Sequence, residues 1–192
     1  MSSAETDVDG RIGARIRSLR AERGLSLDGL AERAAVSRAM LSRIERGESS
    51  PTAQLLGKVC AGLGITLSTL FAETQPAPGP LRRRAEQAGW RDPSSGYLRR
   101  NVAPDGTGST VDISEITLPV GGRVAFDALR LHQADQHIWV LDGTLDITIG
   151  TETHRLASGD CIHMGFDLPV VFSNPARRAT RYAVIIGRGA AG

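Results

Sequence analysis

The sequence predicts a two-domain protein in which an α-helical half precedes a β-sheet half. Up to about residue 71, apolar residues recur at spacings of three and four, which is the period of amphipathic helices. Residues 75–80 read QPAPGP, the composition of a linker. From Val102 onward, short β-branched runs alternate with turn residues, which is typical of a β-sandwich or barrel.

The helical half centres on residues 24–47, where a tight turn separates two short amphipathic segments. Ser26 and Ser37 each precede one segment and are the expected N-caps, because a serine hydroxyl can accept a hydrogen bond from the first helical turn. Gly47 follows the second segment, where a left-handed glycine commonly ends a helix.

The second of these segments has a polar face that favours contact with DNA. That face is expected to hold Arg38, Ala39, Ser42 and Arg43. In the major groove, arginine can bind guanine through two hydrogen bonds, and small apolar groups can contact the methyl of thymine. Taken alone, the same pattern is equally typical of a solvated face in a helical bundle.

The flanking sequence favours the DNA-binding interpretation. Residues 12–71 resemble the helix-turn-helix family of Cro-type repressors and xenobiotic-response-element (XRE) regulators, through matches that include GLSL at 24–27, LSRIERG at 41–47 and PT at 51–52. The resemblance implies a five-helix, lambda-repressor-like domain whose second and third helices form the turn and recognition pair. The residues expected at the DNA are Ser26, Leu27, Ser37, Arg38, Ala39, Ser42, Arg43 and Thr52.

Charge supports this assignment. The net charge is only +2, but residues 11–71 hold ten Lys or Arg against five Asp or Glu, whereas residues 101–192 hold seven Arg against ten acidic residues. A positive helical half is the electrostatic footprint expected for phosphate contact. The run LRRR at 81–84 is either a solvated tether or a further phosphate contact.

Other features predict a cytoplasmic protein. No apolar run approaches the roughly 20 residues that a membrane helix needs, and the polar start is unlike a signal peptide. Cys60 and Cys161 lie far apart, and each has apolar or small neighbours, so buried free thiols are expected.

The β half resembles the cupin family, a small double-sheet jelly-roll barrel. The matches are VLDG with TLDITI at 140–149, LASGD at 156–160 and the later P-x-x-F-x-N-P. The predicted domain order is then a disordered tail at 1–10, the helix-turn-helix domain at 11–72, a linker at 73–104, the cupin at 105–188 and a tail at 189–192. Trp90 and Tyr97 indicate that the end of the linker docks on the cupin.

Many cupins hold a metal ion through His-x-His, a Glu and a distant His. On the family's spacing these four positions fall on Arg130, His132, Gln136 and Val170, and a shift of one residue would bring His137 into the third position. Arginine beside a cation is electrostatically poor, and valine offers no ligand atom. We therefore expect no metal, no other cofactor and no catalytic residue.

The barrel interior is instead expected to hold a small molecule. Its predicted lining is Phe126, Arg130, His132, Gln136, Trp139, Val170 and Phe172. Arginine binds carboxylates and phosphates in a fork, so an anionic effector is favoured. Alternatively, Arg130 forms a salt bridge with Asp127 or Asp135.

Together these features predict a sequence-specific transcriptional regulator whose cupin dimerises and senses a small-molecule effector, with double-stranded operator DNA as the partner of the homodimer. Two alternatives remain open from the sequence. One is a cupin-type metalloenzyme, an oxygenase or isomerase, with a DNA-binding appendage. The other is a cupin that serves only to dimerise.

Overall fold

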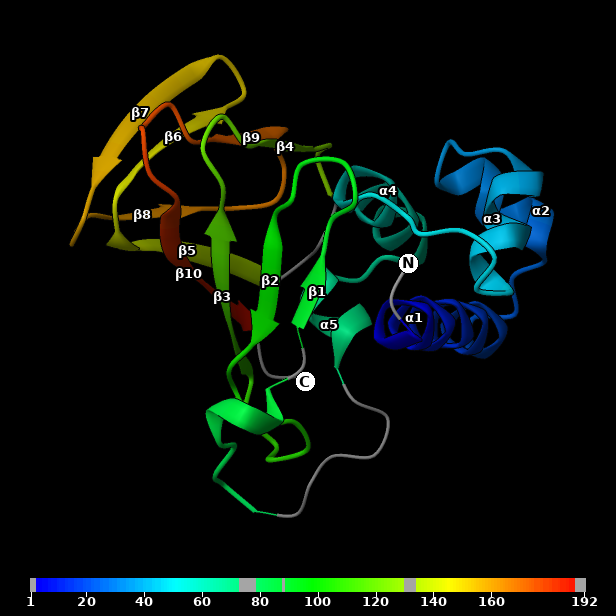
Figure 1. Cartoon of the computed structure of the whole chain (residues 1–192). Helices are drawn as coiled ribbons and strands as arrows, with labels where there is room; N and C mark the ends of the chain where they lie inside the picture. The colour runs from blue at the N-terminus through cyan, green and yellow to red at the C-terminus, as the bar shows by residue number, and fades with distance from the viewer. Residues whose placement is uncertain (1–2, 73–78, 88, 130–133, 189–192) are drawn as a thin grey trace. The chain divides into compact units, whose positions relative to one another are not determined.

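The computed structural model describes residues 3–72, 79–87, 89–129 and 134–188, and the chain divides into two compact units (Figure 1). Unit 1 comprises residues 1–71 and unit 2 comprises residues 72–192. The described part of unit 1 is helical, whereas unit 2 is built mainly from strands. The predicted order, helices followed by β-structure, is confirmed.

Unit 1 has the five predicted helices: α1 (Ser3–Glu22), α2 (Leu27–Arg33), α3 (Arg38–Glu45), α4 (Ala53–Leu63) and α5 (Leu67–Phe71). Both predicted serine caps form. The hydroxyl of Ser26 accepts a hydrogen bond from the Gly29 N–H at 3.0 Å, and that of Ser37 accepts one from the Met40 N–H at 3.2 Å. Gly47 has a φ of 69° and follows the C-cap of α3, as its position predicted.

The start of α1 differs from the sequence prediction. Residues 1–10 were expected to be a disordered tail, but α1 begins at Ser3. Asp9 explains part of the difference, because it is only 7% exposed and its carboxylate accepts a hydrogen bond from the Ser50 hydroxyl. An acidic, polar sequence hides such a contact, since its partner lies 41 residues further along the chain.

The core of unit 1 gathers apolar side chains from four helices. Those that are at most 1% exposed include Ile16, Leu30, Leu41, Ile44 and Leu56. Helices α1 and α3 cross closely at a glycine: a Cβ atom on Gly13 would lie 2.2 Å from the carbonyl oxygen of Ile44. An ion pair closes the same interface, with Arg20 donating to both carboxylate oxygens of Glu45 at 2.6 and 2.8 Å.

Unit 2 contains ten strands and one short 3₁₀ helix, η1 (Arg84–Glu86), among the described residues. The strands are β1 (Gly89–Arg91), β2 (Leu98–Asn101), β3 (Val111–Leu118), β4 (Arg123–Phe126), β5 (Ala134–Asp142), β6 (Thr144–Ile149), β7 (Glu152–Ala157), β8 (Cys161–Met164), β9 (Val170–Ser173) and β10 (Thr180–Arg188).

These strands form the predicted jelly roll. One sheet has the order β1-β2-β3-β10-β5-β8 and the other has the order β4-β9-β6-β7. The eight strands from β3 to β10 therefore divide four and four between two antiparallel sheets, which is the jelly-roll arrangement of cupins. Ile116, Leu118, Ile138, Leu145 and Ile147 are fully buried.

Strands β1 and β2 fall within residues 73–104, which the sequence suggested as a linker. They pair with each other, and β2 pairs with β3, so this stretch extends the six-stranded sheet. Trp90 and Tyr97 are 5% and 2% exposed and meet edge to face with ring centroids 6.4 Å apart. The predicted docking of these aromatic residues is confirmed, although it takes the form of two added strands.

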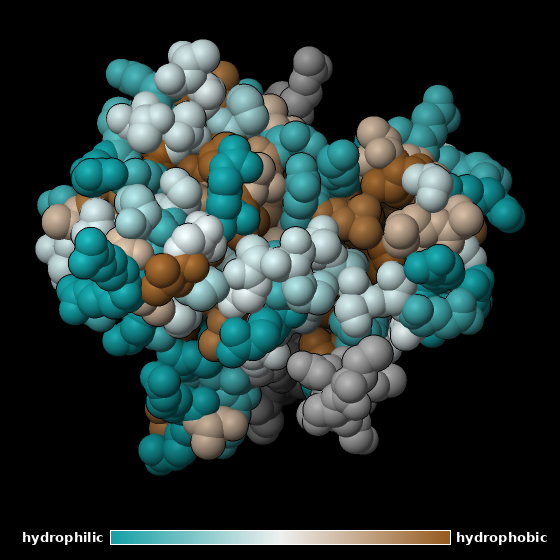
Figure 2. Space-filling model, turned by 45° about the horizontal axis from the view of Figure 1, so that its top comes forward, coloured by the Kyte–Doolittle hydropathy of each residue, from teal (hydrophilic) through white to brown (hydrophobic). Residues whose placement is uncertain are grey.

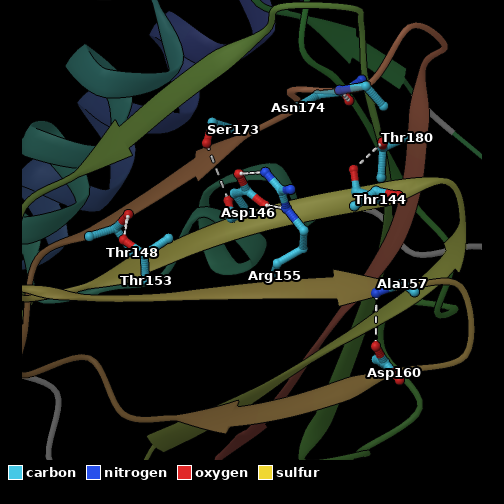
Figure 3. Close-up of polar contacts among 11 residues, drawn as sticks. Thr144, Asp146, Thr148, Thr153, Arg155, Ala157, Asp160, Ser173, Asn174 and Thr180 are labelled. Atoms are coloured by element: carbon cyan, nitrogen blue, oxygen red, sulfur yellow. Dashed lines mark hydrogen bonds and ion pairs between the residues drawn. The ribbon is translucent and has the colours of Figure 1, made fainter.

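The outer face of the four-stranded sheet is polar (Figure 3). Asp146 and Arg155 lie opposite each other on β6 and β7, joined by hydrogen bonds of 2.8 and 2.9 Å. The next outward pair, Thr148 and Thr153, is hydrogen-bonded at 2.9 Å. This face is therefore composed of side chains that water solvates well.

Two predictions about the wider surface can be compared with the structure. On the face shown in Figure 2, hydrophobic residues are exposed only in separate patches between hydrophilic residues. None of the helices in the described part of the chain is long and apolar enough to cross a membrane. Cys60 is buried and outside any disulfide, as predicted, whereas Cys161 is exposed because it points out of the sheet at the start of β8.

Candidate DNA interface and effector pocket

Helix α3 presents its predicted contact residues on one face. Leu41 and Ile44 are buried against the rest of unit 1, whereas Arg38, Ala39 and Arg43 are exposed. Ser42 is half-buried on the same side as these three residues. The sequence spacing thus placed the polar face of the helix correctly, because the helical period fixes which side chains share a side.

Arg38 forms an exposed ion pair whose carboxylate partner another anion can replace. Its guanidinium lies 2.9 Å from the Asp28 carboxylate on α2, and the two side chains are 66% and 72% exposed. Ion pairs this exposed contribute little to stability, since water competes for both partners. Arg38 is therefore available to a phosphate or a base edge.

Arg46 is a residue of this face that sequence reasoning missed. It is the C-cap of α3, one turn after Ser42, and it donates a hydrogen bond to the Ser42 hydroxyl at 2.5 Å. It also donates to both carboxylate oxygens of Glu48 at 2.7 Å, and this hydrogen bonding holds the pKa of Glu48 below its usual value. The spacing of four from Ser42 was the available signal.

The remaining predicted contacts cluster at helix starts. Ser26, Ser37 and Thr52 are the N-caps of α2, α3 and α4. Each hydroxyl accepts a hydrogen bond from its own helix and still carries a proton that it can donate to a phosphate oxygen. Leu27, the first residue of α2, is half-buried beside Ser26.

In unit 2, four of the predicted pocket residues lie in or beside the space between the two sheets. Gln136, Val170 and Phe172 are 7%, 7% and 5% exposed. Phe126 packs edge to face on Phe172, with ring centroids 6.1 Å apart, and Phe172 stacks on Tyr182 at 5.7 Å. An apolar wall with one amide is the kind of lining that small-molecule sites use.

Trp139 does not belong to this lining, so that prediction was wrong. It is 46% exposed on the outer face of β5, while Gln136, Ile138 and Val140 point inward. Side chains alternate between faces along a strand, so residues three apart cannot share one. Arg130 and His132, the other two predicted lining residues, lie outside the described residues.

A buried polar row contributed by β2 and β3 is a further feature that the sequence did not reveal. Arg99, Asn101 and Ser114 are 3%, 9% and 1% exposed. Arg99 donates to the Ser114 hydroxyl at 2.7 Å, and that hydroxyl donates to the Asn101 side-chain oxygen at 3.3 Å. These residues escaped prediction because β2 was assigned to the linker.

The described residues do not fit the metal site found in many cupins. Val170 supplies no ligand atom and Gln136 supplies only a neutral amide, at two of the four positions. Nor does any group of three or more His, Cys, Asp or Glu side chains in the described ranges lie close enough to hold an ion. Asp135, a possible partner of Arg130, lies 3.0 Å from His163 Nε2.

Comparisons with known proteins agree with this arrangement. A family model described as helix-turn-helix (HTH_3) matches residues 16–70. The HTH-type transcriptional regulator SutR of Escherichia coli K12 is 28% identical over 171 residues, covering 89% of this chain and 91% of that protein. The transcriptional regulator ClgR of Mycobacterium tuberculosis is 30% identical over 103 residues, covering 54% of this chain and 80% of that protein.

A solved structure of a transcriptional regulator also matches this chain over nearly its whole length. The HTH_3 family transcriptional regulator from Vibrio cholerae is 25% identical, with a TM-score of 0.76, and the match covers 95% of this chain and 98% of that one. The recognition-helix geometry, the jelly roll and these relatives lead to one assignment: the chain belongs to the HTH_3 (XRE) helix-turn-helix transcriptional regulators and carries a cupin domain.

Proposed function

We propose that this regulator acts in the cytoplasm, binds a specific operator as a homodimer and changes its DNA binding when its cupin holds a small molecule. The observation that supports this most is the exposed face of α3, where two arginines and two small residues stand opposite a buried apolar side. Two copies would present two such helices to half-sites about 34 Å apart, one turn of DNA.

On DNA, α3 enters the major groove. Arg38 and Arg43 bind base edges, and Ala39 contacts a thymine methyl group. Ser26 and Thr52 donate hydrogen bonds to phosphates, which fix the register of the helix without reading sequence. The division follows from chemistry, since guanidinium groups match guanine and hydroxyl groups at helix starts match phosphate oxygens.

In the cupin, the ligand is a small anionic or polar molecule. Gln136 and the aromatic pair of Phe126 and Phe172 line its site, and Arg130, which the cupin spacing assigns to one of the metal-ligand positions, is its electrostatic anchor. The proposed site binds its ligand without a metal and without catalysis. Two of the four family ligand positions hold Gln136, a neutral amide, and Val170, which has no ligand atom. Binding changes operator affinity only as far as the ligand prefers one geometry of the dimer.

The DNA proposal is tested by measuring operator and random-sequence affinity for Arg43→Ala. Loss of one bidentate base contact should cost about 1–3 kcal/mol on the operator and relax specificity at one base pair. Arg17→Ala is a matched control. It removes the same positive charge, and Arg17 is exposed on α1. Equal losses on operator and random DNA would reduce Arg43 to a phosphate contact.

A further inference from the structure

The outer face of the six-stranded sheet differs in character from that of the four-stranded sheet. Along β3, β10 and β5 the odd-numbered side chains point outward, opposite the buried even-numbered ones. Val111, Ile113 and Trp139 are 40%, 37% and 46% exposed there. Two rows of residues cross the face in register: Ile113-Ile185-His137-His163 and Glu115-Ala183-Trp139-Cys161.

We call the apolar residues of these rows, together with Val111, the outer apolar face: Val111, Ile113, Ile185, Ala183, Trp139 and Cys161. The matching face of the other sheet holds the hydrogen-bonded pairs Asp146–Arg155 and Thr148–Thr153 (Figure 3). A contiguous apolar patch with an aromatic residue near its centre is how protein interfaces are usually marked, because its burial removes a large area from water. Only one of the two outer faces thus has the composition of an interface.

Charges flank the outer apolar face unequally. At one end, Glu115 lies between Arg100 at 2.7 Å and Arg181 at 3.3 Å, and Arg178 lies 3.3 Å from Asp142. This end therefore carries three arginines against two carboxylates.

The opposite end carries Asp135, whose carboxylate lies 3.0 Å from His163 Nε2. His137 lies beside it, with its ring centroid 4.9 Å from that of His163. Among the side chains that the structure describes, the two ends therefore differ in the sign of their charge.

From this pattern we propose that the outer apolar face is covered by the same face of a second copy of the chain. In a two-fold dimer each copy supplies the same patch. If the symmetry axis lies between the six-stranded sheets of the two copies, it can place one end of the face in one copy against the other end of the face in its partner. The basic end around Arg181 of one copy then meets the acidic end at Asp135 of the other, while Trp139 is buried near the axis. The inference rests on the proposed homodimer and adds which surface forms it.

Sedimentation velocity of the full-length protein at micromolar concentration tests the surface. Trp139→Asp places a charge at the centre of the apolar face and should raise the dimer dissociation constant about 30-fold or more, the effect of losing a hot-spot residue. Ile113→Glu is a second variant on the same face. Thr153→Asp is the control, because it adds the same charge at an exposed residue on the outer face of the other sheet.

The outcomes separate this inference from the proposed function. Wild-type protein and Thr153→Asp sedimenting as dimers, with Trp139→Asp and Ile113→Glu folded by circular dichroism but monomeric, would support the surface. Dimers that persist in both variants on the apolar face would overturn the surface and leave the homodimer standing. A monomeric wild-type protein would overturn the homodimer itself.

A charge exchange tests the relative orientation of the two copies. Arg181→Glu and Asp135→Arg should each weaken the dimer, since each places like charges across the interface. The double variant restores opposite charges in both symmetric contacts and should regain most of the lost affinity. If the double variant dimerises no more tightly than the weaker-binding single variant, the proposed exchange of ends is wrong.

Discussion

Tyr97 and Tyr182 are the two tyrosines of the chain, and both are buried in unit 2. Burial raises the pKa of Tyr97, an effect that the nearby positive charge of Arg99 partly offsets. Burial raises the pKa of Tyr182 well above its usual value, and the neighbouring Tyr97 adds to the shift. Each phenol is therefore held in its neutral form by the fold.

The tyrosine environment makes a prediction for alkaline pH. The unfolded phenol ionises near pH 10, so a raised folded pKa means that stability is present below about pH 10 and is lost as the pH rises further. Phenolate absorbance should stay low past pH 10 in the folded protein and then rise together with loss of circular dichroism. A smooth titration near pH 10 in protein that stays folded would show that the phenols are solvated.

Trp139 shows why the face on which a strand residue lies is hard to predict from the sequence. The sequence indicated that this region forms a strand and that an aromatic residue belongs to it, but the choice of face depends on strand register. Gln136 and Trp139 were both assigned to the interior, although they differ by three positions and a strand alternates by two. The polar face of α3 was predictable because one residue of error in a helix rotates a side chain by only about 100°.

At the scale of elements, the contact between α1 and α3 depends on the absence of a side chain. Gly10 and Gly13 lie in the same helix, yet only at Gly13 would an added Cβ atom meet another backbone. A Cβ at Gly13 would meet the Ile44 carbonyl oxygen at 2.2 Å, whereas one at Gly10 would meet nothing within 4 Å. The two glycines therefore make a matched pair.

Gly13→Ala should lower the free energy of unfolding by about 1–3 kcal/mol, because the helices must separate to admit the methyl group. Gly10→Ala should raise it by about 0.5–1 kcal/mol, since alanine loses less backbone entropy in a helix. Thermal or urea unfolding of both variants measures the difference. Equal effects of the two substitutions would show that α1 does not pack on α3 through Gly13.

The elements that were predictable are those with local signals. The starts of α2, α3 and α4 follow from Ser26, Ser37 and Thr52, because a cap lies next to the helix that it begins. The first residues of α1 and the strands β1 and β2 depend on partners distant in sequence. Nothing near Arg99 in the chain announces that it packs inside a barrel.

At the scale of the whole molecule, the effector hypothesis joins the two units functionally. Arg130→Met keeps the length of the side chain and removes its charge, so it should abolish any change in operator binding caused by a cell extract that contains the effector. Basal operator affinity should stay the same, because the proposed DNA contacts lie in unit 1. An unchanged response to the extract would remove Arg130 from the ligand site.

The most direct measurement is footprinting of the full-length protein on the DNA fragment that it selects from a random pool. The central claim predicts one protected site made of two similar half-sites, centred about one helical turn apart, which Arg43→Ala leaves unprotected at the same protein concentration. Protection that spreads evenly over any sequence, or a single unrepeated half-site, would contradict a dimeric, sequence-specific regulator.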